Sequence, residues 1–166
     1  MVVDEEQVKN SLLAVGANPM LISKNLAELK STKVSINQPD QLVLGADSVI
    51  SLNDELINKP NTREEGLKIL QKLNGSKHFL ITSVCVSKNG VMVWNFTDQS
   101  ELIMKKLTNK QLVEYLQKIK TETLLNYGVY QIEAGGLELF DSVEGDKNSI
   151  MGLPIKQIKE YLDSTK

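Results

Sequence analysis

The sequence predicts an α/β protein in which a mixed, twisted sheet is flanked by helices. Two observations carry this prediction. Apolar runs rich in β-branched residues are joined by hairpin turns, and they alternate with segments whose apolar residues recur at helical spacing behind capping residues. The length of 166 residues suffices for one core, so we expect a single domain over residues 1–166.

The first half of the chain is predicted to contain three helices, a central strand and a hairpin. Helices are expected behind the caps Asp4, Asn18 and Thr62, the last running to Leu73. Strands are expected at Leu42–Ile50 and Glu55–Asn58, joined by a turn at Asn53–Asp54.

The second half is predicted to be richer in strands. These are expected at Phe79–Val86, Val91–Lys106, Gly128–Ile132 and Leu137–Phe140, with a type I′ turn at Asn89–Gly90 and a loop at Gly145–Ser149. Helices are expected behind the Thr108 cap and after Gly152–Pro154.

The composition excludes several classes of function. A net charge of −2 argues against a general nucleic-acid binder, and one histidine with one cysteine cannot form a zinc site or a disulfide framework. The chain lacks a membrane-length apolar run and a signal peptide, so we expect a cytoplasmic protein with no membrane partner. Carboxylates, hydroxyls and lysines remain, and they favour phosphate chemistry with a metal held by oxygen ligands.

Asp47 is the polar residue that most needs an explanation. It lies within the apolar run Leu42–Ile50, where a carboxylate must be paired, hydrogen-bonded or bound to a cation. One interpretation is a structural aspartate at a strand end, and the other is a catalytic carboxylate. The local sequence leaves both open.

The order of several motifs along the chain is more specific. These motifs are Gly45–Val49, Lys59–Pro60 after a hairpin, Leu73–Gly75 with His78 and Thr82, Gly128–Tyr130 with Ile132–Glu133, and Gly145–Asp146 with Gly152–Pro154. Together they resemble the Maf family of nucleotide pyrophosphatases, and the C-terminal part is most similar to the alphaproteobacterial branch.

The resemblance implies a fold like that of inosine triphosphatases, with two lobes around a cleft, and usually a homodimer. It also implies a nucleoside triphosphate pyrophosphohydrolase that uses Mg²⁺ or Mn²⁺ to release a monophosphate and pyrophosphate, with pyrimidine or modified nucleotides as the expected substrates. By position, Asp47 and Glu5 match the catalytic acids around the metal, and Lys30 and Lys59 match the phosphate-binding lysines. Ser48, Thr82 and Glu133 match substrate-binding positions.

The chain also departs from the family pattern. Family members begin with a strand and a Ser-x-Ser-x-x-Arg loop, whereas Met1–Val3 matches the end of the family's next segment, so we expect an N-terminally short form. An exposed sheet edge would then favour a homodimer. The alternatives are a non-catalytic nucleotide-binding or regulatory protein that lacks this loop, and a stable domain that has lost its site.

Overall fold

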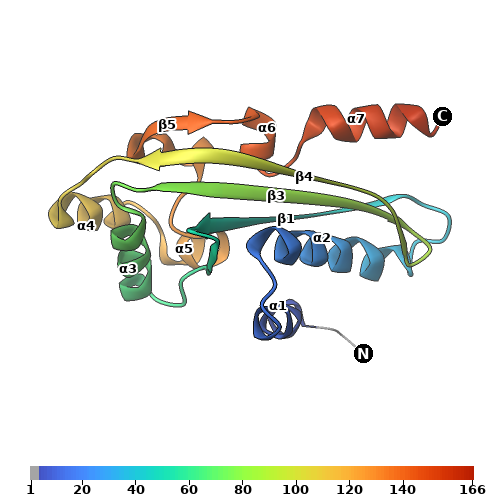
Figure 1. Cartoon of the computed structure of the whole chain (residues 1–166), viewed down its shortest axis with the longest axis horizontal. Coiled ribbons are helices and arrows are strands. Elements are labelled where there is room, and N and C mark those ends of the chain that lie inside the picture. The colour runs from blue at the N-terminus through green and yellow to red at the C-terminus, as the bar shows by residue number, and fades with distance from the viewer. Residues whose placement is uncertain (1–3) are drawn as a thin grey trace.

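The sheet is the frame on which the other elements are built. The computed structural model describes residues 4–166, so the expectation for Met1–Val3 lies outside the described residues. Within this range the strands form one five-stranded sheet in the order β2-β1-β3-β4-β5 (Figure 1). They are β1 (Val43–Leu52), β2 (Glu55–Ile57), β3 (Lys77–Lys88), β4 (Val91–Met104) and β5 (Phe140–Glu144).

The α/β class is confirmed, but the prediction of a mixed sheet is wrong. Every pairing between the described strands is antiparallel. Asn53 and Asp54 have φ values of 51° and 64°, and Asn89 and Gly90 have φ values of 50° and 80°. These left-handed pairs make the tight turns that join β1 to β2 and β3 to β4, and such turns connect antiparallel neighbours only.

The helices begin at the caps that the sequence predicts. Asp4 accepts a hydrogen bond from the Glu6 N–H at 3.1 Å, and Asn18 accepts one from the Leu21 N–H at 2.9 Å. Thr62 and Thr108 cap two further helices in the same way. The helices are α1 (Glu5–Ala14), α2 (Pro19–Ser35), α3 (Arg63–Leu73), α4 (Asn109–Gln117), α5 (Thr121–Tyr127), α6 (Lys147–Ile150) and α7 (Ile155–Ser164).

The segment between α5 and α7 differs from the prediction. Gly128–Ile132 is not a strand, and the short 3₁₀ helices η1 (Ile132–Ala134) and η2 (Gly136–Leu139) replace the strand expected at Leu137–Phe140. Gly135 has a φ of 89°, and a Cβ at Gly136 would collide with the Gln131 backbone, so the chain folds back on itself instead of extending. Helix α6 occupies most of the expected loop Gly145–Ser149, and α5 was not predicted.

Side chains on the two faces of β1 meet different partners. Gly45 faces α2, because a Cβ there would collide with the backbone of Ala27 and Ser31. Successive residues of a strand point to opposite faces, so Asp47 shares this face and Ser48 lies on the other. The Ser48 face also carries Leu52, which packs in the apolar core built with α3 and α4.

His78 and Tyr130 form a buried polar contact at one side of this core. The His78 ring is fully buried, its Nε2 lies 3.0 Å from the Tyr130 hydroxyl, and Phe140 packs against both rings. Burial lowers the pKa of His78 to about 4, because the interior disfavours the imidazolium. The imidazole is therefore neutral near pH 7.

We predict that NMR titration of this single histidine gives a midpoint near pH 4 in the folded protein. Between pH 6.5 and pH 4 the unfolded chain binds a proton that the folded chain rejects, so this group lowers stability as the pH falls through that window. Urea unfolding at pH 7 and pH 5 should show the loss, and His78→Gln should reduce it. A titration midpoint near 6.5 would contradict the buried, neutral ring.

We predict that Gly45→Ala lowers the free energy of unfolding by about 1–3 kcal/mol, because the added methyl group forces α2 away from β1. Gly66→Ala is the matched control. There the methyl group meets only the ends of the Leu124 and Leu116 side chains, and alanine favours the surrounding helix. Urea denaturation measures both, and equal stabilities of Gly45→Ala and the wild type would refute the close approach.

Candidate active site

A cavity of about 660 Å³ lies along the free edge of β1. Among residues 4–166, strand β2 pairs only with Ile50–Leu52, so the preceding part of β1 pairs with β3 alone. The cavity reaches side chains from both faces of this strand. The residues that line the cavity include Glu5, Glu6, Lys9, Lys30, Asp47, Ser48, Lys59, Tyr130, Glu133 and Ile150.

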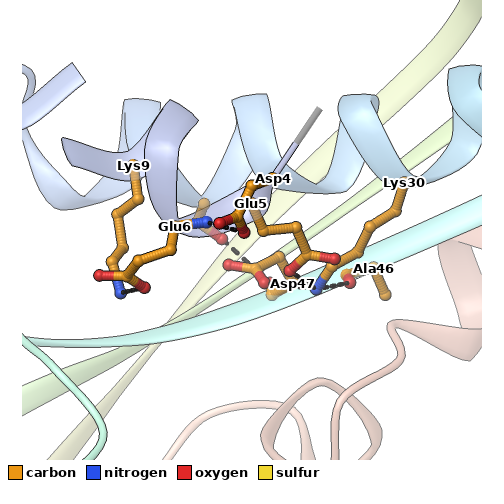
Figure 2. Close-up of polar contacts among 8 residues, drawn as sticks. Asp4, Glu5, Glu6, Lys9, Lys30, Ala46 and Asp47 are labelled. Atoms are coloured by element: carbon orange, nitrogen blue, oxygen red, sulfur yellow. Dashed lines mark hydrogen bonds and ion pairs between the residues drawn. The ribbon is translucent and has the colours of Figure 1, made fainter. Parts of the chain in front are cut away.

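Three predicted site residues meet on the α2 face. The Lys30 ammonium lies 2.8 Å from Asp47 Oδ1 and 3.5 Å from Glu5 Oε2, and it also donates to the Ala46 carbonyl at 3.4 Å (Figure 2). Figure 2 shows the two carboxylates converging on this ammonium from α1 and β1. The structure therefore brings Glu5, Lys30 and Asp47 together, although the two acids lie 42 positions apart in the sequence.

The close packing of α2 on β1 positions this cluster. Ser23 of α2 donates a hydrogen bond to the Asp47 carbonyl at 3.0 Å, and Gly45 leaves the space that lets the helix approach. Two turns after Ser23, Lys30 reaches the Asp47 carboxylate from the same helix. The Asp47 side chain is only 12% exposed, whereas that of Glu5 is 55% exposed.

The charges of the cluster shift one another's pKa. Burial raises the pKa of Asp47 above its usual value, and the hydrogen bond and charge of Lys30 oppose this increase only in part. Burial tends to lower the pKa of Lys30, but the hydrogen bond and charge of Asp47, with Glu5, raise it overall. Lys30 is therefore a permanent cation beside a carboxyl group that takes up a proton more readily than an exposed aspartate.

Two more lysines line the cavity near the acids. Lys59 follows β2, and its positive charge favours the ionised form of Asp47. Lys59 is exposed, and Pro60 directly after it is buried. A residue before a proline favours an extended backbone, which is the basis of the prediction that Lys59 projects from the loop. Lys9 of α1 lies 2.8 Å from Glu6.

Ser48 and Thr82 lie on the face of the sheet opposite to Asp47, and Glu133 lies on η1. Ser48 and Glu133 both line the cavity, and Glu133 is exposed at its surface on η1. Thr82 is placed differently: it is buried behind Ser48, to which it is hydrogen-bonded at 3.0 Å, and it does not line the cavity.

Sequence reasoning missed Lys9 and the wall formed by Gly128–Gln131. Glu5 and Lys9 are one helical turn apart, a spacing that places them on one side of α1 and could have included Lys9 in the site. The wall was missed because a strand was predicted there. The folded-back segment instead places Tyr130 and Gln131 at the cavity.

The carboxylates of Glu5 and Asp47 suit a hard divalent cation. Mg²⁺ is commonly held by one or two carboxylates, with water and substrate phosphates completing its shell. Across residues 4–166 no cluster of three or more His, Cys, Asp or Glu residues is placed to hold a metal ion. The described residues therefore do not form a closed structural metal site.

Comparison with known proteins defines the family. A profile described as "Maf-like protein" matches residues 1–165. The chain belongs to the Maf-like family. It is 54% identical over 160 residues to the nucleoside triphosphate pyrophosphatase of Pelagibacter ubique, an alignment that spans 96% of this chain and 82% of that protein.

More distant relatives of this Maf-like protein carry two names. The chain is 34% identical over 160 residues to the nucleoside triphosphate pyrophosphatase of Ruegeria pomeroyi. It is also 34% identical over 160 residues to a protein of Rhizobium johnstonii named 7-methyl-GTP pyrophosphatase. Each alignment spans 96% of this chain and 80% of the relative. The resemblance that the motif order indicates is thus confirmed.

The single arginine of this Maf-like protein has a structural role. The Arg63 guanidinium donates to the carbonyls of Leu116 and Ile119 and, at 3.0 Å, to the Thr121 hydroxyl. It thereby ties α3 to the end of α4 and the start of α5. With the arginine engaged there, lysines are the cationic side chains at the cavity.

We predict that Lys30→Gln moves the acidic limb of the pH–rate profile to higher pH, because Asp47 loses the cation that favours its ionised form. The loss of one cation at the phosphates should also lower kcat/KM by roughly a hundredfold. Lys33→Gln, an exposed position on the same helix, is the control and should leave both unchanged. An acidic limb at the wild-type position in Lys30→Gln would contradict the coupling.

Proposed function

We propose that this Maf-like protein hydrolyses nucleoside triphosphates to nucleoside monophosphates and pyrophosphate at the β1 cavity, with Glu5 and Asp47 holding a divalent cation. The observation that carries the proposal is the convergence of Glu5, Asp47 and Lys30, with Lys59, in a cavity large enough for a nucleotide. Family membership and the names of its relatives support the same reaction.

The two faces of β1 suggest how the substrate lies. The triphosphate carries the negative charge, so it is drawn to Lys30 on the α2 side and to Lys59, which also lines the cavity. The nucleoside then extends past the free edge of β1 toward Ser48 and Glu133 on the other side. The substrate would thus straddle the strand, with its α-phosphate beside Asp47.

The chain's own groups account for the main step. Asp47 accepts a proton from a water molecule whose oxygen forms a bond to the α-phosphorus, while the bond from that phosphorus to the bridging oxygen breaks and pyrophosphate leaves. Lys30 and Lys59 stabilise the charge that gathers on the leaving group. A bound Mg²⁺ or Mn²⁺ would neutralise phosphate charge and polarise the phosphoryl group.

The Ser48 side of the cavity supports a preference at the nucleobase. The Glu133 carboxylate accepts hydrogen bonds from base N–H groups and attracts a positively charged base. This fits the sequence-based expectation of pyrimidine or modified nucleotides, and one relative is named 7-methyl-GTP pyrophosphatase. The proposed substrates are therefore UTP, dTTP or nucleotides with a modified base.

The homodimer, the cytoplasmic location and the lack of a nucleic-acid partner stay predictions from the sequence. Within residues 4–166 no helix is long and apolar enough to cross a membrane. The predicted cytoplasmic location agrees with a substrate that comes from the cellular pool of nucleotides.

The reaction is tested by incubating the protein with UTP, dTTP, CTP and 7-methyl-GTP in the presence of Mg²⁺. We predict monophosphate and pyrophosphate as products. Asp47→Asn should lower turnover by at least about a hundredfold because the amide cannot take the proton. Asp141→Asn, at an exposed position on β5 away from the cavity, should keep wild-type turnover.

Two results would contradict the proposal. Diphosphate and phosphate as products would place attack at the γ-phosphorus. Nucleotide binding without hydrolysis, measured by calorimetry, would support the alternative of a non-catalytic nucleotide-binding protein. Circular dichroism of Asp47→Asn shows whether a loss of turnover comes with a folded chain.

A further inference from the structure

A chain of hydroxyl groups runs from the cavity into the interior. Ser48 Oγ lines the cavity and lies 3.0 Å from Thr82 Oγ1, and Ser48 and Thr82 are directly opposed in the pairing of β1 with β3. Thr82 Oγ1 in turn donates to the Ser149 carbonyl at 2.9 Å. Thr82 is 1% exposed, so its hydroxyl depends on these two partners.

The direction of these hydrogen bonds follows from the number of protons. A carbonyl oxygen only accepts, so the single Thr82 proton is used on Ser149. Thr82 can then only accept from Ser48, and the Ser48 proton points inward to Thr82. The lone pairs of Ser48 Oγ remain for the cavity, where Ser48 acts as an acceptor and not as a donor.

We propose that Thr82 is a positioning residue that makes Ser48 a hydrogen-bond acceptor toward the substrate, so that the group bound at Ser48 is an N–H or O–H donor of the nucleoside and not a phosphate oxygen. The inference deepens the proposed function, since it rests on a nucleotide in this cavity. The two donors that a nucleoside offers are an N–H of the base and a ribose hydroxyl.

The position of Ser149 gives Thr82 a second effect on the same wall. Asp146 caps α6 by accepting from the Ser149 N–H at 2.8 Å, while Thr82 holds the Ser149 carbonyl. The next residue, Ile150, lines the cavity. The backbone N–H and the backbone carbonyl of Ser149 are thus both held beside the place where the nucleoside is expected.

The test compares nucleotides that differ by one donor. UTP is compared with 2′-deoxy-UTP and with 3′-deoxy-UTP, each of which lacks one ribose hydroxyl, and with N3-methyl-UTP, which lacks the base N–H. Each is measured as kcat/KM, and the affinity of the matching α,β-methylene analogues is measured by calorimetry. The wild type should prefer the donor-bearing member of one pair by about tenfold, the usual effect of one hydrogen bond, and the pair that responds identifies the donor.

Three variants separate positioning from a purely structural role. In Thr82→Val the Ser48 proton loses its acceptor and can turn to the ligand. The ratio of kcat/KM between the nucleotides with and without the donor should therefore fall to near one. Ser48→Ala, on the surface of the cavity, should show the same loss. Thr82→Ser keeps the hydroxyl and should keep the preference. A purely structural role of Thr82 would lower activity on all nucleotides alike and leave the ratio unchanged.

The outcomes distinguish this inference from the reaction itself. Binding with the predicted donor preference but without hydrolysis supports the inference while it overturns the proposed reaction. If the wild type and Ser48→Ala show the same ratio of kcat/KM between nucleotides with and without the donor, the inference is overturned while the proposed reaction stands. Absence of nucleotide binding overturns both. If Thr82→Val does not fold, the Ser48→Ala and Thr82→Ser ratios decide the matter.

Discussion

The contact between the Lys30 ammonium and the Asp47 and Glu5 carboxylates joins α1, α2 and β1 at a single point. A carboxylate that is only 12% exposed needs a cation beside it, and the cation must come from an element packed against the strand. Gly45 permits that packing because it leaves room for the α2 backbone two residues before Asp47. The ion pair between Lys30 and Asp47 therefore depends on the close packing of α2 against β1.

The second constraint is the alternation of side chains along β1. Asp47 and Ser48 are neighbours in sequence but lie on opposite faces, and no strand in the described part of the chain pairs with the edge of β1 between them, because β2 is short. A cavity at this edge can take an anionic group on one side and a neutral polar group on the other. Thr82 donates to the Ser149 carbonyl and accepts from Ser48, so on the neutral side of the cavity Ser48 can only accept a hydrogen bond.

The sequence was informative where local signals and tertiary structure agree. Helix caps such as Asp4 and Asn18 and the Asn89–Gly90 turn act over a few residues, and the structure confirms them. Between Gly128 and Phe140 the alternation of apolar residues favours strands. In the structure Gly136 packs closely against the Gln131 backbone, and the alternation pattern carries no information about this contact. The placement of Thr82 could not be predicted for the same reason: the resemblance indicates a hydroxyl near the site, and only the strand register shows that it lies behind Ser48.

The proposed function requires that a nucleoside triphosphate lies across the edge of β1 at Asp47 and Ser48. A crystal structure with an α,β-methylene nucleotide and Mg²⁺ tests this. We expect the α-phosphate beside Asp47 and Lys30, and the nucleoside on the other side of the strand, beside Ser48 and Glu133. A nucleotide whose phosphates and base both lie on one face of β1, or outside this cavity, would contradict it.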